Sequence, residues 1–136
     1  VYITGKMYVD NLAIVHDTHS SAGGTVIVVG ETVNLKQNSS FTVSDSSHYI
    51  ILVSRSNKDD VSNRAIDAEN NSASILFVAL NGRVLIVNNG SLNATMAKTV
   101  ELKKSTIQFN KTLTQLFVPS AGGKQVGTVS GSWGEK

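Results

Sequence analysis

The stretch ILFVALNGRVLIVNNGSLNATMAKTVELKKSTIQF, residues 75–109, sets the structural pattern of this chain. Its apolar and alternating segments form four short runs: Ile75–Leu80, Arg83–Val87, Ala94–Thr99 and Thr99–Phe109. These runs are too short for an amphipathic helix, and their β-branched composition is typical of strands. Asn-Gly pairs at 81–82 and 89–90 favour turns, because both residue types tolerate a positive φ. The stretch therefore predicts successive strands joined by tight turns.

The same pattern extends through most of the chain. Strands are predicted at Val1–Thr4, Lys6–Asp10, Leu12–His16, Thr25–Val29, Glu31–Leu35, Ser40–Val43, Tyr49–Ser54, Thr114–Val118 and Val126–Trp133. The long polar interruption at Arg55–Ser74 predicts a loop, or a short helix capped by Ser56 or Asn57. The sequence thus predicts an all-β fold in a single domain, residues 1–136, with a long polar loop at 55–74.

A short internal repeat favours a solenoid. Residues 32–36 (TVNLK) and 99–103 (TVELK) agree at four of five positions. Their separation fits three coils of roughly 22 residues, which is a usual length for solenoid repeats. We therefore expect a short right-handed β-helix, or β-solenoid, with the following pairs pointing inward: Val33/Leu35, Val84/Ile86, Val100/Leu102 and Ile107/Phe109. A β-sandwich is the alternative, because short strands with regular turns occur in both architectures.

Some of the predicted strands are apolar on both faces, for example TVIVV at 25–29 and VLIV at 84–87. A solenoid strand with one face in water should instead alternate apolar and polar residues. We therefore expect a later part of the chain, a partner chain or a preceding segment to cover the outer face. The expected docking surface consists of Ile27, Val29, Leu76, Val78, Leu85 and Val87.

Composition narrows the functional classes. The 136 residues carry a formal net charge of +2 and contain no cysteine, which excludes disulfides and thiolate chemistry. The small net charge gives no reason to expect nucleic acid as a partner. A modest basic cluster, Lys98, Lys103, Lys104 and Lys111, lacks the interleaved aromatic residues that stack on bases. No apolar run in this sequence approaches the roughly 20 residues of a membrane-spanning helix.

Two polar clusters contain residue types that could form a chemical site. His16, Asp17 and His19 could hold a divalent metal, but no further ligand stands at a recognised spacing, and an exposed turn is the simpler interpretation. The run Ser44–His48 contains the residue types of a hydrolase triad, but in one local segment that favours a turn. The sequence therefore predicts no catalytic constellation, no enzyme activity and no cofactor.

Four charged residues in the polar interruption form a possible ligand or interaction loop: Arg55, Asp59, Asp60 and Arg64. On a β-helix face, such residues could bind or cleave an acidic polysaccharide, provided that they converge in a groove. A solvated loop is the simpler interpretation. Asn-x-Ser/Thr triplets begin at Asn38, Asn70, Asn89, Asn93 and Asn110; they indicate surface turns and potential glycosylation sites.

The order of segments between Leu76 and Phe109 carries a family resemblance. The progression consists of Ala79-Leu80-Asn81-Gly82, Val84-Leu85-Ile86, Asn88-Asn89-Gly90-Ser91-Leu92 and Ala94–Leu102, with Gly131-Ser132-Trp133-Gly134 near the end. It resembles the C-terminal β-helical domain of PilX-like pilus assembly proteins, which are type IV pilin-like proteins of bacteria. The resemblance covers about half of the chain and consists of turn motifs.

This resemblance implies a non-catalytic structural or adhesive head domain of a type IV pilus or pseudopilus. The expected location is the cell surface, and the membrane would be reached only through a natural N-terminal anchor that this sequence lacks. Expected partners are other pilin subunits or that missing helix, and possible ligands include surface carbohydrate. Two other functions stay open: a carbohydrate-binding or -cleaving β-helix, and a self-assembling bactofilin-like β-solenoid scaffold. Trp133 and the polar tail suggest a cap, which argues against the scaffold.

Overall fold

The computed structural model describes residues 1–16, 23–43, 48–69, 75–88, 91–92 and 94–107. These residues contain strands and no helix, so the all-β prediction is confirmed for this part of the chain. The strands are β1 (Tyr2–Ile3), β2 (Met7–Val9), β3 (Ala13–His16), β4 (Gly23–Val29), β5 (Val33–Leu35), β6 (Ser40–Val43), β7 (His48–Ser54), β8 (Asp59–Asp60), β9 (Asn63–Arg64), β10 (Ile66–Glu69), β11 (Ile75–Val87), β12 (Ser91–Leu92), β13 (Ala94–Lys103) and β14 (Thr106–Ile107).

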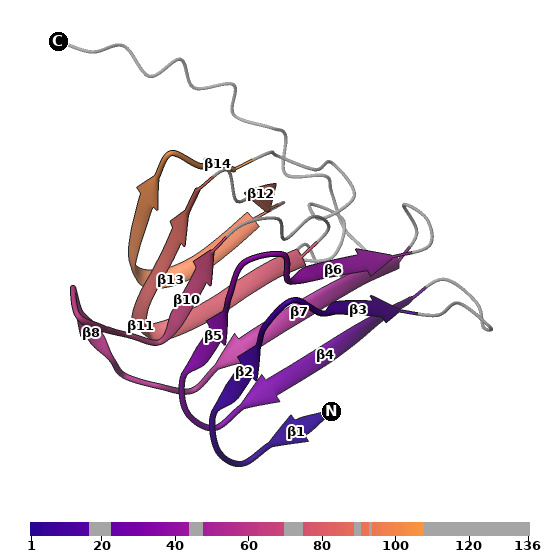
Figure 1. Cartoon of the computed structure of the whole chain (residues 1–136). Helices are drawn as coiled ribbons and strands as arrows, with labels where there is room; N and C mark the ends of the chain where they lie inside the picture. Colours follow the sequence, from indigo (N-terminus) through magenta and orange to yellow (C-terminus); the bar gives the residue numbers. More distant parts are fainter. Residues whose placement is uncertain (17–22, 44–47, 70–74, 89–90, 93, 108–136) are drawn as a thin grey trace, which may run out of the picture.

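Eight strands form one parallel sheet, in the order β1-β4-β7-β11-β10-β5-β2, with β13 also paired to β11. Figure 1 shows two rows of strands. The first row contains β1, β4 and β7, and the second row contains β2, β5 and β10. The rows meet on β11, whose first half pairs with β7 and whose second half pairs with β10. Smaller parallel pairs are β3 with β6 and β12 with β14.

Asn81 and Gly82 lie within β11, so the turn predicted there is wrong. The register against β13 shifts between Ala79 and Arg83, which marks an irregularity where the strand passes from one row to the other. Strand-like hydrogen bonds continue across this point, because the Arg83 amide donates to the Lys58 carbonyl and the Ala65 amide donates to the Arg83 carbonyl. These pairings override the local turn preference of Asn-Gly. Gly82 serves close packing instead, since an added Cβ would come within 2.7 Å of the Ser56 carbonyl oxygen.

The predicted polar loop at 55–74 is also corrected. It contains the antiparallel pair β8 and β9, followed by β10, which lies between β5 and β11 in the main sheet. Ala65, Ile66 and Ala68 are fully or almost fully buried. This segment therefore contributes three apolar residues to the core, although it is polar overall. Residues 70–74 lie outside the described part of the chain.

The internal repeat is stacked in the second row. Val33 pairs with Ile66, Ile66 with Val84, and Val84 with Val100. The two copies therefore stand three strand pairings apart. The intervals are 33, 18 and 16 residues rather than equal steps, and the longest of them contains the β8–β9 hairpin.

The hydrophobic core is formed by the inward-facing side chains of both rows. Val33, Leu35, Val84 and Ile86 are at most 2% exposed, which confirms that they point inward. Val100 and Leu102 are 41% and 44% exposed, so the inward prediction is wrong for them. Among the described strands β13 pairs only with β11, and no further described strand covers these two side chains. The Ile107 side chain and Phe109 lie outside the described part.

The expected docking surface is not an exposed face of the described structure. Ile27 and Val29 belong to the hydrophobic core and cannot present a surface. Leu76 and Leu85 lie outside that core cluster, yet they are only 1% and 4% exposed. Val78 and Val87 are half-buried. Leu85 is in register between Asp67 and Glu101, so charged side chains flank it where we expected a docking partner.

Candidate functional site

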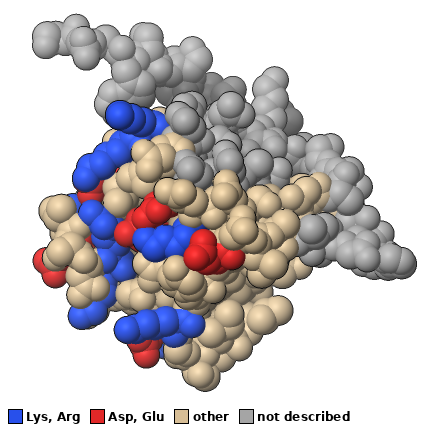
Figure 2. Space-filling view, viewed as in Figure 1, with Lys and Arg blue, Asp and Glu red and all other residues tan. Residues whose placement is uncertain are grey.

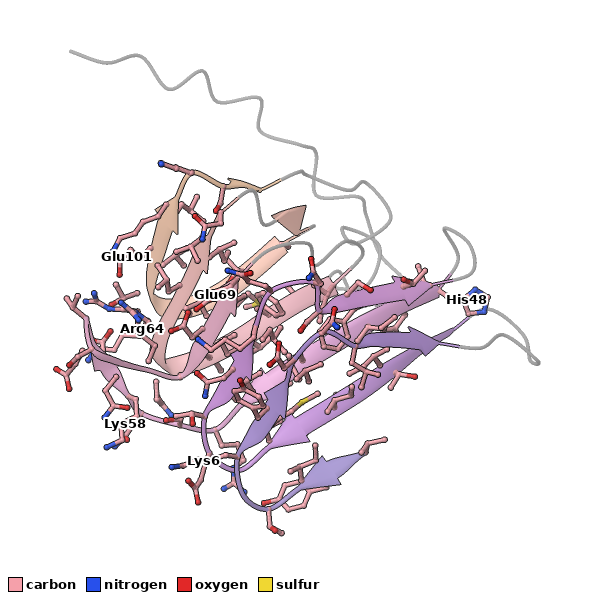
Figure 3. All side chains as sticks on the ribbon, in the orientation of Figure 1. Lys6, His48, Lys58, Arg64, Glu69 and Glu101 are labelled. Carbon is pink, nitrogen blue, oxygen red and sulfur yellow. The ribbon has the colours of Figure 1, made fainter. Side chains whose placement is uncertain are left out.

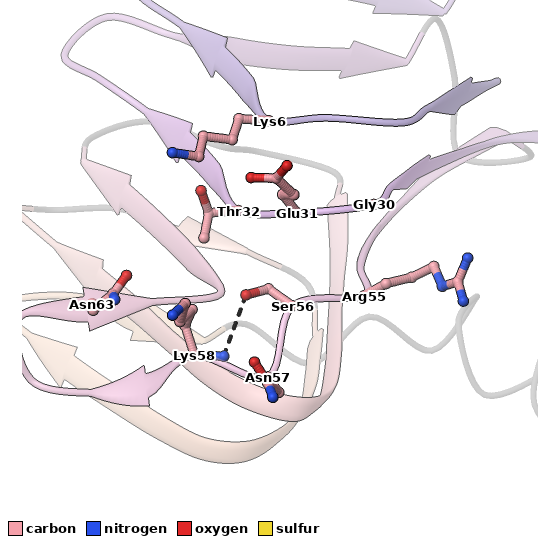
Figure 4. Close-up of a pocket in the computed structure, with 9 residues that line it drawn as sticks. All are labelled: Lys6, Gly30, Glu31, Thr32, Arg55, Ser56, Asn57, Lys58 and Asn63. Atoms are coloured by element: carbon pink, nitrogen blue, oxygen red, sulfur yellow. Dashed lines mark hydrogen bonds between the residues drawn. The ribbon is translucent and has the colours of Figure 1, made fainter.

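A pocket of about 570 Å³ opens where successive connections of the chain run close together. The connection from β1 to β2 contributes Lys6, and the connection from β4 to β5 contributes Gly30, Glu31 and Thr32. The segment after β7 contributes Arg55–Lys58, and Asn63 of β9 completes the lining (Figure 4). The pocket therefore unites residues that are far apart in sequence.

Backbone hydrogen bonds fix these connections against one another. The amides of Gly30 and Glu31 donate to the carbonyls of Ile3 and Gly5, at 2.8 and 3.1 Å. The Ser54 hydroxyl donates to the Glu31 carbonyl at 2.8 Å. Gly30 is required by close approach, because a Cβ at this position would overlap the carbonyl oxygen of Thr4. The pocket wall is thus set by main-chain contacts.

The pocket lining is polar and carries both signs of charge. Figure 4 shows Lys6 on one side of Glu31 and Thr32, and Lys58 on the other side. The guanidinium of Arg55 points away from the two lysines, and it donates a hydrogen bond to the Tyr2 hydroxyl at 3.2 Å. The remaining side chains offer hydroxyl or amide groups, and none of the lining residues is apolar apart from the glycine.

A second polar region, which we call the ion-paired face, lies on the strands around β11. Asp59 is 3.0 Å from Lys98 and 3.6 Å from Arg83, which in turn is 3.4 Å from Glu101. Glu101 also pairs with Lys103 at 2.8 Å. Two separate pairs complete the face: Arg64 with Asp67 at 3.1 Å, and Lys36 with Glu69 at 2.7 Å. Figures 2 and 3 show acidic and basic side chains interspersed there.

These contacts favour the charged forms of the groups involved. The hydrogen bond from Lys98 lowers the pKa of the Asp59 carboxyl, and the one from Lys103 lowers the pKa of Glu101. The hydrogen bond to Glu69 raises the pKa of Lys36. The carboxylates are thus engaged by neighbouring cations at neutral pH, which suits a structural role better than proton transfer.

The two regions contain all but one of the described lysine and arginine side chains, the exception being Lys104. Five cations of the ion-paired face each have a carboxylate partner: Lys36, Arg64, Arg83, Lys98 and Lys103. Within the described residues, no ion pair includes Lys6, Arg55 or Lys58, and all three line the pocket. Apart from Lys104, the described lysine and arginine side chains without a carboxylate partner therefore lie at one place.

The four charged residues predicted to form an interaction loop do not converge in one groove. Arg55 lines the pocket, but Asp59 and Arg64 face each other across the β8–β9 pair and take part in the ion-paired face. Asp60 lies on β8 beside them. A polysaccharide-cleaving site built from these four residues is therefore not supported by the geometry.

The sequence interpretation missed Lys6, Glu31 and Lys58. A usable signal exists for part of this set, because the pocket residues Lys6, Glu31 and Ser56 follow one another at intervals of 25 residues, and Lys58 lies two residues further on. The first row repeats at nearly the same interval, since Gly23 pairs with His48 and Ile50 pairs with Ile75. The assumed coil of roughly 22 residues hid this alignment.

The other sequence candidates fall mostly outside the described structure. His16 ends β3, but its side chain is not described, and Asp17, His19 and residues 44–47 lie outside the described part. Among the described residues, no group of three or more His, Asp or Glu side chains could hold a metal ion. The same residues include no helix that is long and apolar enough to cross a membrane.

Comparisons with protein-family models, with curated proteins and with solved structures found no match to this chain. Its function must therefore be argued from its own residues.

Proposed function

We propose that this chain is a non-catalytic structural head domain built as a short right-handed β-helix. The supporting observation is the strand register. Along the chain, β1, β2 and β3 are followed in the same order by β4, β5 and β6. Each strand of the first set pairs in parallel with the corresponding strand of the second set, so that one circuit of the chain stacks on the next. Right-handedness follows from the general rule for connections between parallel strands.

A structural role is consistent with where the polar groups lie. The interior of the described chain is apolar, and Ser39 and Ser54 are its buried polar residues. Both donate hydrogen bonds to backbone carbonyls, of Val9 and Glu31 respectively. Stacked repeats of this kind contact mainly their neighbours and give a stiff body whose outer surface can be displayed.

The architecture is testable by removing one complete circuit. Deleting residues 24–48 joins Gly23 to Tyr49, the register partner of Gly24, so a β-helix should close up with one circuit fewer. We expect this variant to unfold cooperatively in urea. A deletion of residues 24–35, which is out of register, should abolish that transition. If both deletions unfold the chain, as a β-sandwich predicts, the β-helix proposal is wrong.

The cellular setting is proposed to be a pilin-like surface protein. Support comes from the sequence resemblance between residues 76 and 109, which spans the paired strands β11 and β13. On this proposal the domain stands outside the cytoplasmic membrane and associates with other pilin subunits.

The gene's upstream reading frame tests this setting. A short charged leader followed by about 20 apolar residues is expected ahead of Val1. Antibodies against the chain should also detect it in pili sheared from the parent cells, and a strain with the gene deleted supplies the control. A gene that begins near Val1, or a pilus fraction without the chain, would contradict the proposal.

A further inference from the structure

We infer that the pocket between the connections binds a hydroxyl-rich ligand that bears carboxylates, an acidic oligosaccharide, with Lys6 and Lys58 as its cationic contacts. The inference does not depend on the pilin-like setting, because it rests on the pocket alone. Its volume of about 570 Å³ lies in the usual range for small-ligand sites, roughly 300–1,000 Å³.

The charge distribution indicates an anionic ligand. Lys6 and Lys58 approach the pocket from its two sides, and neither has a carboxylate partner among the described residues. An ammonium group that is not engaged elsewhere can bind an incoming carboxylate without first breaking an internal ion pair. Both lysines are exposed, so the attraction is expected to be modest and sensitive to salt.

The neutral side chains narrow the ligand class. Thr32, Ser56, Asn57 and Asn63 offer donors and acceptors that match sugar hydroxyls. Among the described residues, no aliphatic or aromatic side chain lines the pocket, which disfavours a lipid or other apolar ligand. The Glu31 carboxylate lies between the two lysines, where it can accept hydrogen bonds from hydroxyls and repel a densely charged polyanion. A chain of spaced carboxylates fits this arrangement best.

The pocket wall is also organised in advance of binding. Main-chain bonds join residues 3, 5, 30 and 31, and the Arg55 amide donates to the Val29 carbonyl at 2.9 Å. The Ser56 hydroxyl accepts a hydrogen bond from the Lys58 amide at 3.3 Å. A wall held in this way needs little ordering when a ligand binds, which favours affinity.

Titration of the chain with tetragalacturonate, followed by calorimetry at low ionic strength, tests the inference. We expect saturable binding that weakens by about tenfold or more in the double variant Lys6→Gln/Lys58→Gln. The matched control is Lys104→Gln, because Lys104 is exposed, lacks an ion pair among the described residues and does not line the pocket. Its affinity should change by less than about twofold.

Two further ligands distinguish recognition of carboxylates from nonspecific electrostatic attraction. Fully methyl-esterified tetragalacturonate keeps the sugar but loses the carboxylates, and it should bind about tenfold more weakly or not at all. A sulfated tetrasaccharide should not bind more tightly than the carboxylated one, because the Glu31 carboxylate repels a densely charged polyanion. Absence of binding by the unaltered chain overturns the inference. So does equal binding of the ester, tighter binding of the sulfated sugar, or an equal loss in Lys104→Gln.

Discussion

The ion-paired face and the pocket use the same types of charged side chain in opposite ways. On the face, cations and carboxylates lie on neighbouring strands, as when Lys36, which follows β5, meets Glu69 at the end of β10. Strands in register stand about 4.8 Å apart, so side chains on adjacent rungs readily reach one another. At the pocket the chain turns between rows, and Lys6 and Lys58 stay without a carboxylate partner among the described residues.

The difference shows that, in one parallel sheet, the strands carry the charged pairs that stabilise the fold, whereas the connections carry charged side chains that stay accessible. Pairing between strands places opposite charges together, and these charges are then engaged in holding the strands. The connections are held by their backbone instead, through bonds such as the one from the Gly30 amide to the Ile3 carbonyl. Their side chains therefore remain available for a ligand. Three substitutions or conditions should separate these two modes of stabilisation.

The largest effect is expected from Gly30→Ala, which acts on the backbone of the pocket. The new methyl group would overlap the Thr4 carbonyl oxygen, so the free energy of unfolding should fall by about 1–3 kcal/mol in urea titrations. Gly5→Ala is the matched control, because a Cβ there meets nothing within 4 Å. Its effect should stay within about 0.5 kcal/mol. Equal effects of the two substitutions would show that close backbone packing does not hold the pocket.

A smaller effect is expected from Arg83→Gln, which acts on the ion-paired face. The substitution removes the cation between Asp59 and Glu101, although Lys98 and Lys103 remain as partners. A loss of about 1 kcal/mol in the free energy of unfolding should result. Arg55→Gln is the control, since it loses only an exposed hydrogen bond to Tyr2 and should cost less than about 0.5 kcal/mol. A larger loss for Arg55→Gln than for Arg83→Gln would reverse the assigned roles.

The smallest effect is expected in the loss of stability at acidic pH. The folded pKa values of Asp59 and Glu101 are lowered from their ordinary values of 3.8 and 4.5, so their ion pairs contribute fully above those values. The contribution is lost as the pH falls from about 4.5 through the lowered folded pKa values. Urea midpoints measured from pH 7 to pH 3 should therefore fall less steeply in Asp59→Asn/Glu101→Gln than in the unaltered chain.

Asp60→Asn provides the control for the acid prediction. Asp60 lies next to Asp59 on β8 but takes part in no ion pair among the described residues. Its substitution should leave the slope of the acid limb unchanged. An acid limb with the same slope in the double variant and in the unaltered chain would mean that the ion-paired face adds nothing to stability.

Local sequence determined most of the segments that become strands and, in several of them, which side chains enter the core. The alternation in VNL at 33–35 and in VLI at 84–86 fixes Val33, Leu35, Val84 and Ile86 as inward residues, because successive side chains of a strand point to opposite faces. The likeness of residues 32–36 and 99–103 placed both segments in one row. The alternation depends on near neighbours and the repeat on sequence similarity, so both can be recognised without knowing which strands pair.

The tertiary structure decided the rest. Asn81-Gly82 stays extended and Ile66–Glu69 becomes a central strand because strands distant in sequence supply their hydrogen bonds. The same distant pairing exposes Val100 and Leu102, which sit on a strand with one described partner. It also brings Lys6, Glu31 and Lys58 to one pocket. Local periodicity carries no information about which strands pair or at what interval, and those pairings alone place the candidate site.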